Sequence, residues 1–530
     1  MTLASQPPLA RVIEGHAERR PEGLAFVEGE TRVTWSDYAR RSDALAALLI
    51  DLGLDRGERV AVLLPDGAGV HVAYVALEKA GLVAVGIGAR AGRGEIEHLL
   101  RKTRAVALVS RVRQGDVDLV ALVAELRDAG LALRHHVRTD GDFAIGDALA
   151  LDAEEAPLDP AQPPDARRPL GVDELWLLNS TSGTTGLPKC VMHHQRRWFA
   201  FHELALRAAR FTTEDVFMSV VPAPFGFGLW TAHFTPAILG VPTVLLSRFS
   251  ADAAVAALGR ERVTVLAAVS TQFILMLGSP ALAAGRPPAL RALFTGGEKV
   301  PYERAADFEE RTGAVVLQFY GSNETGALSG TSLDDPRERR LRTAGRVIPE
   351  MQVRLFDAEG RDVTATGRGQ PGCKGAVTSL GYLDDEAANK ELLRDDGWML
   401  VGDLVSIDAD GWLTVEGRVA DFIIRGGKNV SAAQVESIAE THPAVALSAA
   451  VAMPDPVFGE RVCLFVELAP GATLDLAGLA AHMTSRGASK EILPEHLVVV
   501  PELPRSSGGK VAKGALRDEA ARRAAGSVTS

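Results

Sequence analysis

Leu175-Trp176-Leu177-Leu178 is followed, after Asn179, by Ser180-Thr181-Ser182-Gly183-Thr184-Thr185-Gly186-Leu187-Pro188-Lys189. The apolar run is typical of a buried strand, and the next ten residues combine hydroxyls, two glycines and a lysine. Glycine lets the backbone approach an anion closely and aim N–H groups at it, while the hydroxyls and the Lys189 ammonium supply further donors. The stretch therefore predicts a strand that ends in a loop binding the phosphates of a nucleotide triphosphate.

This loop differs from the GxxxxGK[ST] phosphate loop. Lys189 follows Leu187-Pro188 rather than a glycine, and Cys190 stands where Ser or Thr would hold magnesium. For this segment alone, an ordinary surface loop rich in Ser, Thr and Gly is the alternative.

The sequence before this loop alternates amphipathic helical patterns with short apolar runs. Helices are expected at Ser36 to Leu52 and Gly69 to Ala80, and strands at Arg59 to Leu64 and Val83 to Val85. Short continuous apolar strands between helices are typical of a parallel sheet covered on both faces. The fold class is therefore α/β, with an exposed connection from Glu154 to Arg168.

The same pattern resumes after the loop and then changes. Further strands are expected at Thr243 to Leu246, Val263 to Ala267 and Ala292 to Phe294, whereas short strands with turn signals such as Asp408-Ala409-Asp410-Gly411 follow Gly372. Beyond Arg418 the sequence predicts a helix at Ala432 to His442 and strands at Ser448 to Ala452 and Val462 to Glu467. We expect a large domain at 1–418 and a small α+β lid at 419–530.

Composition excludes several classes of protein. With 530 residues the chain exceeds the size of a single core, so two or more domains are expected. The formal net charge of -11 argues against nonspecific nucleic-acid binding. Cys190, Cys373 and Cys463 form no CxxC pair, so neither a zinc site nor a disulfide framework is predicted. No signal peptide or membrane span is evident, and a cytoplasmic location is expected.

Several further segments, in order along almost the whole chain, resemble the adenylate-forming superfamily of acyl-CoA synthetases, amino-acid adenylation domains and luciferases. They are Thr181 to Lys189, Phe294-Thr295-Gly296-Gly297-Glu298, Gln318-Phe319-Tyr320-Gly321-Ser322-Asn323-Glu324-Thr325, Val401-Gly402-Asp403-Leu404, Gly417-Arg418-Val419 and Pro504 to Lys510. The resemblance is most like an acid:CoA ligase. Alone, each segment has a simpler interpretation as a turn or a solvated charge.

The resemblance implies roles for individual residues. Tyr320 would stack on adenine, Asp403 and Arg418 would bind the ribose hydroxyls, and Lys510 would enter the site on a C-terminal loop to bridge the acid and the α-phosphate. Glu324 and Thr184 would hold Mg²⁺. The nucleotide-binding set implied is Thr181, Ser182, Gly183, Thr184, Thr185, Gly186, Lys189, Gly297, Glu298, Tyr320, Gly321, Asn323, Asp403, Arg418 and Gly427.

The chemistry needs these charges. A carboxylate must attack the α-phosphorus of ATP, so two anions are brought together and pyrophosphate must be stabilised as it leaves. No covalent enzyme intermediate is required, and no Ser-His-Asp candidate is present. His193 and His194 are interpreted as structural, because adjacent residues of an extended segment face opposite sides.

For the second half-reaction the resemblance implies that the small domain swings away from the site. The pivot would be Ala420, and the loop Arg425-Gly426-Gly427-Lys428-Asn429 would line a pantetheine tunnel. Ala420 departs from the usual Asp or Lys. Three further departures are Cys190 for Gly, Val401 for Thr and Asn323 for Thr.

The acid is predicted from Pro222-Ala223-Pro224-Phe225-Gly226-Phe227-Gly228-Leu229-Trp230, which matches the family segment whose fourth residue, Phe225, closes over the carboxylate. Amino-acid-activating relatives carry an Asp here for the substrate ammonium. Phe225, Phe227 and Trp230 give a desolvated ammonium no partner, so an apolar acid is expected: aromatic, alicyclic, branched or fatty. Pocket depth would depend on Phe273, Gly296 and Ala327.

Two acceptors fit the sequence. Coenzyme A is favoured, because long-chain AMP ligases that serve carrier proteins tend to carry an insertion that obstructs the thioester-forming state. No such insertion is apparent between Asp403 and Lys428. A carrier protein is the alternative. A nucleotide-binding protein without catalysis is disfavoured by the presence of all the charged residues above. The oligomeric state, monomer or homodimer, stays open.

Overall fold

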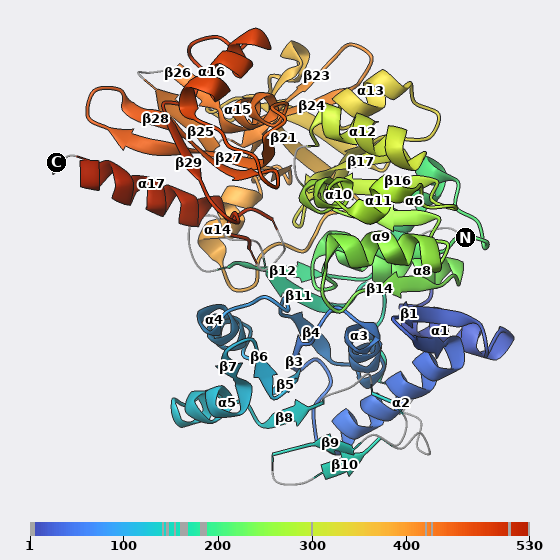
Figure 1. Cartoon of the computed structure of the whole chain (residues 1–530). Coiled ribbons are helices and arrows are strands. Elements are labelled where there is room, and N and C mark those ends of the chain that lie inside the picture. The colour runs from blue at the N-terminus through green and yellow to red at the C-terminus, as the bar shows by residue number, and fades with distance from the viewer. Residues whose placement is uncertain are drawn as a thin grey trace.

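The computed structural model describes residues 6–139, 143–144, 148–152, 155–158, 168–180, 188–297, 300–418, 421–425, 428–506 and 510–527. Two large halves are each built around a mixed sheet, and two smaller sheets follow (Figure 1). The fold is α/β, as predicted. No helix in the described part of the chain is long and apolar enough to cross a bilayer.

The first half contains the strand that leads into the phosphate loop. Its sheet has the order β10-β9-β8-β5-β3-β4-β11-β12, and neighbouring strands from β8 to β11 run parallel. The strands are β3 (Arg59–Leu63), β4 (Val83–Gly86), β5 (Ala107–Ser110), β8 (His135–Arg138), β9 (Ala148–Ala150), β10 (Glu155–Pro157), β11 (Leu177–Ser180) and β12 (Cys190–His193).

Helices cover both faces of this sheet, which explains the continuous apolar strands. Val60 and Val62 of β3 pack in one cluster with helices α2 (Trp35–Asp51) and α3 (Ala68–Ala80). The alternate residues Ala61 and Leu63 pack on α4 (Arg93–Thr103) and α5 (Leu119–Asp128). At the start of α2 the Thr34 hydroxyl accepts the backbone N–H of Asp37 (3.0 Å) as half of a capping box.

The second half has a nine-stranded sheet with the order β19-β18-β17-β16-β15-β13-β14-β1-β2. Its helices α9, α10 and α12 cover one face, and α6 packs on the other through the core shared with the first half. The bounds are β1 (Leu24–Glu28), β2 (Thr31–Thr34), β13 (Phe217–Ser219), β14 (Thr243–Leu245), β15 (Val265–Ala267), β16 (Ala292–Gly296), β17 (Val315–Ser322), β18 (Gly326–Gly330), β19 (Arg346–Val347), α6 (Arg196–Ala209), α9 (Ala251–Arg260), α10 (Ser270–Leu277) and α12 (Tyr302–Thr312).

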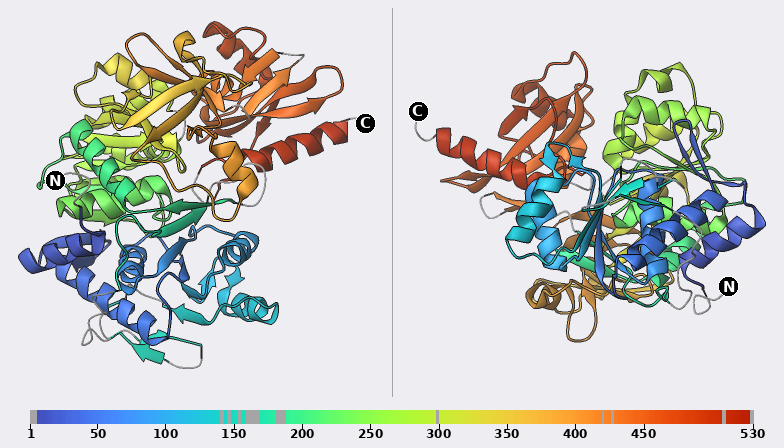
Figure 2. Two further views of the ribbon diagram at one scale, coloured as in Figure 1. Left: turned by 180° about the vertical axis from the view of Figure 1, so that it is seen from behind. Right: turned by 90° about the horizontal axis from the view of Figure 1, so that it is seen from below.

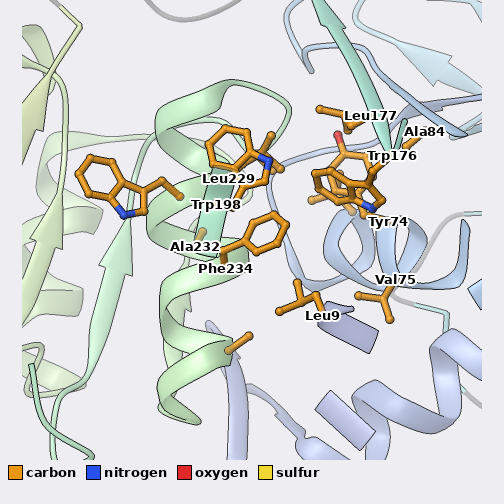
Figure 3. Packing of buried hydrophobic residues seen from close by; sticks show 14 of the residues in the cluster. Leu9, Tyr74, Val75, Ala84, Trp176, Leu177, Trp198, Leu229, Ala232 and Phe234 are labelled. Carbon is orange, nitrogen blue, oxygen red and sulfur yellow. The ribbon is translucent and has the colours of Figure 1, made fainter. Parts of the chain in front are cut away.

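A continuous aromatic core joins the two halves. Trp176 precedes β11, and Phe234 lies in a helical segment that runs through α7 (Gly226–Gly228), a π-helical turn (Leu229–Phe234) and α8 (Thr235–Leu239). Their rings pack edge to face with centroids 5.2 Å apart, and Trp198 of α6 stacks on Phe234 at 5.6 Å (Figure 3). The halves therefore hold each other at a fixed position.

A third sheet lies between the nine-stranded sheet and the C-terminal part of the chain. It has the order β20-β21-β23-β24, and β22 pairs with β21. The hairpin of β23 and β24 turns at Asp408 to Gly411, where the sequence predicts a turn. The bounds are β20 (Met351–Phe356), β21 (Arg368–Gly375), β22 (Met399–Leu400), β23 (Asp403–Ile407) and β24 (Leu413–Arg418).

The C-terminal residues form a separate sheet with the order β26-β25-β28-β27, to which β29 adds beside β28. Helices α15 and α16 pack on one face, and α17 packs on β27 and extends outward (Figure 2). The bounds are β25 (Phe422–Arg425), β26 (Lys428–Ser431), β27 (Val445–Asp455), β28 (Gly459–Leu468), β29 (His496–Val499), α15 (Ala432–Ala439), α16 (Leu476–Ser485) and α17 (Lys513–Ser527).

This C-terminal part docks on α12 of the second half. Arg304 donates hydrogen bonds to the backbone oxygens of Glu440 (3.2 Å) and Val445 (3.0 Å). Inside the domain, α17 is tied to Asp421, the first described residue after β24, because Arg517 and Lys513 both pair with its carboxylate. The domain boundary at 418/419 stays a prediction, although β24 does end at Arg418.

The remaining elements are short or peripheral. They are α1 (Leu9–Arg19), β6 (Arg113–Gln114), β7 (Val117–Asp118), α11 (Pro280–Ala284), α13 (Arg337–Arg342), a 3-10 turn (Thr364–Thr366) and α14 (Glu386–Leu392).

The predicted elements are present, with bounds that differ by a few residues. The helix expected to reach His442 ends at Ala439, and the strand expected from Leu175 begins at Leu177. The prediction that 154–168 is only a connection is wrong for Glu155–Pro157, which pair with β9 as an edge strand. Pro157 is compatible with that place, because an edge strand does not need every N–H for pairing.

Candidate nucleotide and acid site

Three predicted residues meet at the start of the β23–β24 hairpin. Asp403 and Arg418 are directly paired across it, and Arg418 Nε lies 3.4 Å from Asp403 Oδ1. The Tyr320 hydroxyl, from the end of β17, donates to Asp403 Oδ2 (2.8 Å). The backbone pairing thus places a carboxylate, a guanidinium and a phenol ring side by side, as recognition of a ribose and a flat base requires.

The electrostatics of this group follow from burial. Only 7% of Asp403 is exposed, and burial raises the pKa of its carboxyl, although the charge of Arg418, the Tyr320 hydroxyl and the charge of Lys510 oppose that shift. Burial and the Asp403 charge raise the pKa of Tyr320 well above its usual value. The protonation state of Asp403 therefore depends on the balance between its burial and the opposing effects of Arg418, Tyr320 and Lys510.

Lys510 reaches this site from the C-terminal domain. A Cβ built on Gly297 would lie 3.2 Å from Lys510 Nζ, and the Lys510 charge also acts on Asp403. Gly297 has φ +78°, a conformation that favours glycine. The lack of a side chain at Gly297 also leaves room for Lys510. The predicted lysine and the predicted glycine loop are therefore neighbours, although 213 positions separate them in the sequence.

A second group lies at the end of the phosphate loop. The Tyr382 hydroxyl donates to Glu324 Oε1 (2.8 Å), and Lys189 Nζ lies 5.0 Å from the centroid of the Tyr382 ring. Burial, followed by the Glu324 charge, raises the pKa of Tyr382, so this phenol stays protonated and donates. Tyr382 is a site residue that the sequence analysis missed, because no motif marks it.

Asn323 lies beside the start of the helical segment that follows Phe225. A Cβ on Gly226, the residue after Phe225, would lie 3.1 Å from Asn323 Oδ1. Phe225 itself is partly exposed at the N-terminus of the helical segment Gly226–Leu239. Gly321 has a packing reason to be glycine, because a Cβ there would lie 1.8 Å from the Gly326 carbonyl oxygen.

The remaining predicted residues lie outside the described part of the chain. They are Thr181, Ser182, Gly183, Thr184, Thr185, Gly186, Glu298, Ala420 and Gly427. Their assigned roles stay predictions.

Two family models match the chain. The "AMP-binding enzyme" model matches residues 13–383, and the "AMP-binding enzyme C-terminal domain" model matches residues 434–510. The chain belongs to the AMP-binding enzyme family. It is thus an adenylate-forming enzyme, most like the acid:CoA ligases, that uses ATP to activate a carboxylic acid as acyl-AMP.

Similar curated proteins span nearly the same length. A salicylyl-CoA synthase / salicylate adenylyltransferase of Streptomyces sp is 33% identical, covering 96% of this chain and 93% of that protein. A 2-hydroxy-7-methoxy-5-methyl-1-naphthoate--CoA ligase of Streptomyces carzinostaticus is 33% identical (96% and 92%). A salicyl-AMP ligase / salicyl-S-ArCP synthetase of Mycobacterium tuberculosis is 32% identical (96% and 90%).

The fold has a solved counterpart. The structure of the anthranilate CoA ligase AuaEII in complex with anthranoyl-AMP superposes with a TM-score of 0.88 at 23% identity, covering 99% of this chain and 100% of that chain. The arrangement of the sheets is therefore that of an adenylate-forming enzyme.

Replacing Asp403 by Asn tests the ribose assignment. The KM for ATP should rise about tenfold, since a charge-assisted hydrogen bond is lost. Because burial raises the pKa of Asp403, its carboxylate is present above that raised pKa and is lost as pH falls through it. The wild-type KM for ATP should thus rise on acidification earlier than an ordinary aspartate would allow, and Asp403→Asn should lack this rise. The same rise of the KM for ATP at low pH in the wild type and in Asp403→Asn would contradict the assignment.

Replacing Tyr382 by Phe tests its contact with Glu324. Loss of one hydrogen bond to a carboxylate should lower acid-dependent ATP–pyrophosphate exchange by about three- to tenfold and raise the Mg²⁺ concentration needed for half-maximal rate. Tyr302→Phe is the matched control, since Tyr302 donates to Glu338 (3.0 Å) on the surface. Equal effects of the two substitutions would show that the Glu324 contact has no special role.

Proposed function

We propose that this enzyme is an ATP-dependent acid–CoA ligase for an apolar carboxylic acid without an amino group, of the aromatic, alicyclic or similarly bulky kind. It forms acyl-AMP, releases pyrophosphate, transfers the acyl group to coenzyme A and releases AMP. The observation that carries this proposal is the meeting of Lys510 with Gly297 beside the Asp403–Arg418–Tyr320 group.

In the first half-reaction, Asp403 and Arg418 hold the ribose while Lys189 and the loop before it hold the outer phosphates. Lys510 then lies where the incoming carboxylate and the α-phosphate meet, and its charge offsets the repulsion between these two anions. A carboxylate oxygen forms a bond to the α-phosphorus as the bond to pyrophosphate breaks. Positioning and electrostatic stabilisation are the main catalytic contributions.

Glu324 fits a Mg²⁺ ion that accompanies ATP. It is a carboxylate beside the lysine of the phosphate loop, and Mg²⁺ in nucleotide sites takes one or two carboxylates together with phosphate oxygens. When bound, the ion would neutralise phosphate charge and assist departure of pyrophosphate. Tyr382 fixes the Glu324 carboxylate for this task, and Thr184 remains the second predicted ligand.

The acid class is inferred from the segment that carries Phe225. Trp230 packs against Phe201 (centroids 5.1 Å apart) and Phe227 (5.8 Å), so the helical segment that follows Phe225 carries packed aromatic side chains. A substrate ammonium would lose its hydration here without gaining an anion from this segment. The names of the three relatives described above all concern aromatic acids, which supports an aromatic substrate.

Coenzyme A is the proposed acceptor, and the C-terminal domain must move before it can react. Lys510 covers the site in the present arrangement, so a thiol needs another approach. We propose rotation about Ala420, which removes Lys510 and brings the loop that contains Gly427 toward the site. The salicyl-S-ArCP synthetase among the relatives supports a carrier protein as the second candidate acceptor.

The experiment is acid-dependent ATP–pyrophosphate exchange over benzoates, alicyclic acids, fatty acids and polycyclic acids, followed by AMP release with and without coenzyme A. We expect exchange with aromatic acids and AMP release that coenzyme A stimulates. Lys510→Ala provides the background rate. Exchange without a response to coenzyme A would favour the carrier protein, and no exchange with any acid would overturn the proposal.

A further inference from the structure

The turn that carries Phe225 is held by two side chains from the other half of the molecule. Asn179, at the end of β11, donates from Nδ2 to the carbonyl oxygen of Pro224 (2.8 Å). Asp66, between β3 and α3, accepts the backbone N–H of Ala223 at Oδ1 (3.0 Å). Both polar groups belong to consecutive residues of the turn, so its backbone is bonded to the first sheet immediately before Phe225.

Asn179 also binds Asn323, the residue before Glu324. Asn323 Nδ2 donates to Asn179 Oδ1 (2.6 Å), and Asn179 Nδ2 lies 3.3 Å from Asn323 Oδ1. Only 1% of Asn179 is exposed, so water does not compete for these bonds. One buried amide therefore links the Phe225 turn to the Tyr320–Glu324 segment.

The orientation of the Asn179 amide follows from a chain of donors. Arg197 donates to Nδ1 of His193, so the proton of that ring is on Nε2, which donates to Asn179 Oδ1 (2.7 Å). Burial, followed by the charges of Arg197 and His194, holds the pKa of His193 well below its usual value, so the ring stays neutral. Arg197 also donates to the Asn323 backbone oxygen (3.0 Å). This chain fixes which end of the amide faces Pro224.

The turn has no room to relax toward the first sheet. A Cβ on Gly86 of β4 would lie 2.8 Å from Pro224 Cβ and 2.9 Å from the Tyr74 hydroxyl. Pro224 thus packs directly on the backbone of β4. Contact on one side and hydrogen bonds on two neighbouring residues define one position for the turn.

We propose that Asn179 and Asp66 are positioning residues that set where Phe225 meets the carboxylate of the acid, and that Asn179 acts partly through its bonds to Asn323. This rests on the proposed function, in which Phe225 closes over that carboxylate. Neither residue bonds to the Tyr320–Asp403–Arg418 group in the contacts given above. Their removal should therefore affect acid binding and alignment more than ATP binding.

The kinetic test uses Asn179→Ala and Asp66→Ala. Each should raise the KM for the acid about tenfold and leave the KM for ATP within about twofold, because a lost tether misplaces the turn but leaves the contacts among Tyr320, Asp403 and Arg418 in place. Asp66→Asn keeps an acceptor oxygen for Ala223 N–H and should restore most of the acid KM. Asp335→Ala is the control, since Asp335 tethers the Ser332 N–H (2.7 Å) in another turn; its acid KM should be unchanged.

A double-mutant cycle with Asn323→Ala tests the link to Asn179. If Asn179 acts partly through Asn323, the combined loss should be smaller than the product of the two single losses. Fully multiplicative effects would overturn that part of the proposal. Equal increases of the KM values for the acid and for ATP in both alanine variants would show that Asn179 and Asp66 stabilise the structure in general and do not position the acid.

Hydrogen–deuterium exchange without any acid separates this proposal from the proposed function. Peptides covering 221–230 should exchange at least several-fold faster in Asn179→Ala and Asp66→Ala than in the wild type, with peptides of β23 and β24 unchanged. Unchanged exchange at 221–230 would overturn the positioning role even if the ligase activity is confirmed. A wild type that shows no ATP–pyrophosphate exchange with any acid would overturn only the proposed function. Hydrogen–deuterium exchange at 221–230 would still decide whether Asn179 and Asp66 hold the turn in place.

Discussion

Lys510→Ala is expected to lower acid-dependent ATP–pyrophosphate exchange by about two to three orders of magnitude or more, the loss typical of removing a key electrostatic donor. Lys510 Nζ lies beside Gly297 and its charge acts on Asp403, so a cation is present where the acid and the α-phosphate are proposed to meet. ATP binding should be nearly unaffected, because the residues proposed to bind the ribose and the base lie on β17, β23 and β24, before the C-terminal sheet.

Equilibrium binding of a fluorescent ATP analogue and the exchange rate would be measured on the same preparations. Lys490→Ala is the control, since this exposed lysine belongs to the same domain. Undiminished exchange in Lys510→Ala would refute the assigned role. A parallel loss of ATP binding would instead make Lys510 a nucleotide-binding residue rather than one that acts on the reacting groups.

Glu324→Gln should have the second largest effect, about a hundredfold lower exchange together with a higher Mg²⁺ requirement. The substitution keeps the size of the side chain and leaves an oxygen for the Tyr382 hydroxyl, so the charge is the main property lost. The rate would be measured across a Mg²⁺ titration.

Glu386→Gln, at an exposed position of α14, is the matched control and should behave as wild type. If excess Mg²⁺ restored Glu324→Gln completely, Glu324 would act only in ion affinity. If the Mg²⁺ dependence stayed unchanged while the rate fell, the metal assignment would be wrong and Glu324 would act directly on the substrates.

The sequence predicts the strands and turns around the site well, because these elements follow from local patterns. The turn at Asp408 to Gly411 predicts the hairpin, and the hairpin register then places Asp403 opposite Arg418. The alternation of apolar and helical segments likewise predicts strands β3, β4 and β11, which run parallel. Lys510 was found through resemblance, since an isolated lysine near the end of a chain has no local signal.

Other parts of the site could not be predicted from the sequence. Asn179, Asp66 and Tyr382 form contacts with segments 45 or more positions away, and Asn179 and Asp66 bond there to the backbone of Pro224 and Ala223. A bond to a backbone group does not depend on the side chain of the partner residue, so the sequence of the partner segment does not indicate it. His193 is buried and was expected to be structural, and its place between Arg197 and Asn179 depends on how β12 lies beside β11.

The ion pairs of α17 have a consequence for timing. Lys510 lies three positions before α17, and α17 is tied through Arg517 and Lys513 to Asp421, next to the proposed pivot; Lys513 also pairs with Glu436 (2.7 Å) of α15. In the proposed rotation these ion pairs would make α17, and the loop before it that carries Lys510, move together with the rest of the C-terminal domain. If the domain rotates as proposed, a newly made acyl-adenylate would stay covered until that rotation, so the intermediate would be shielded from water and the order of the two half-reactions would follow from the motion of one body.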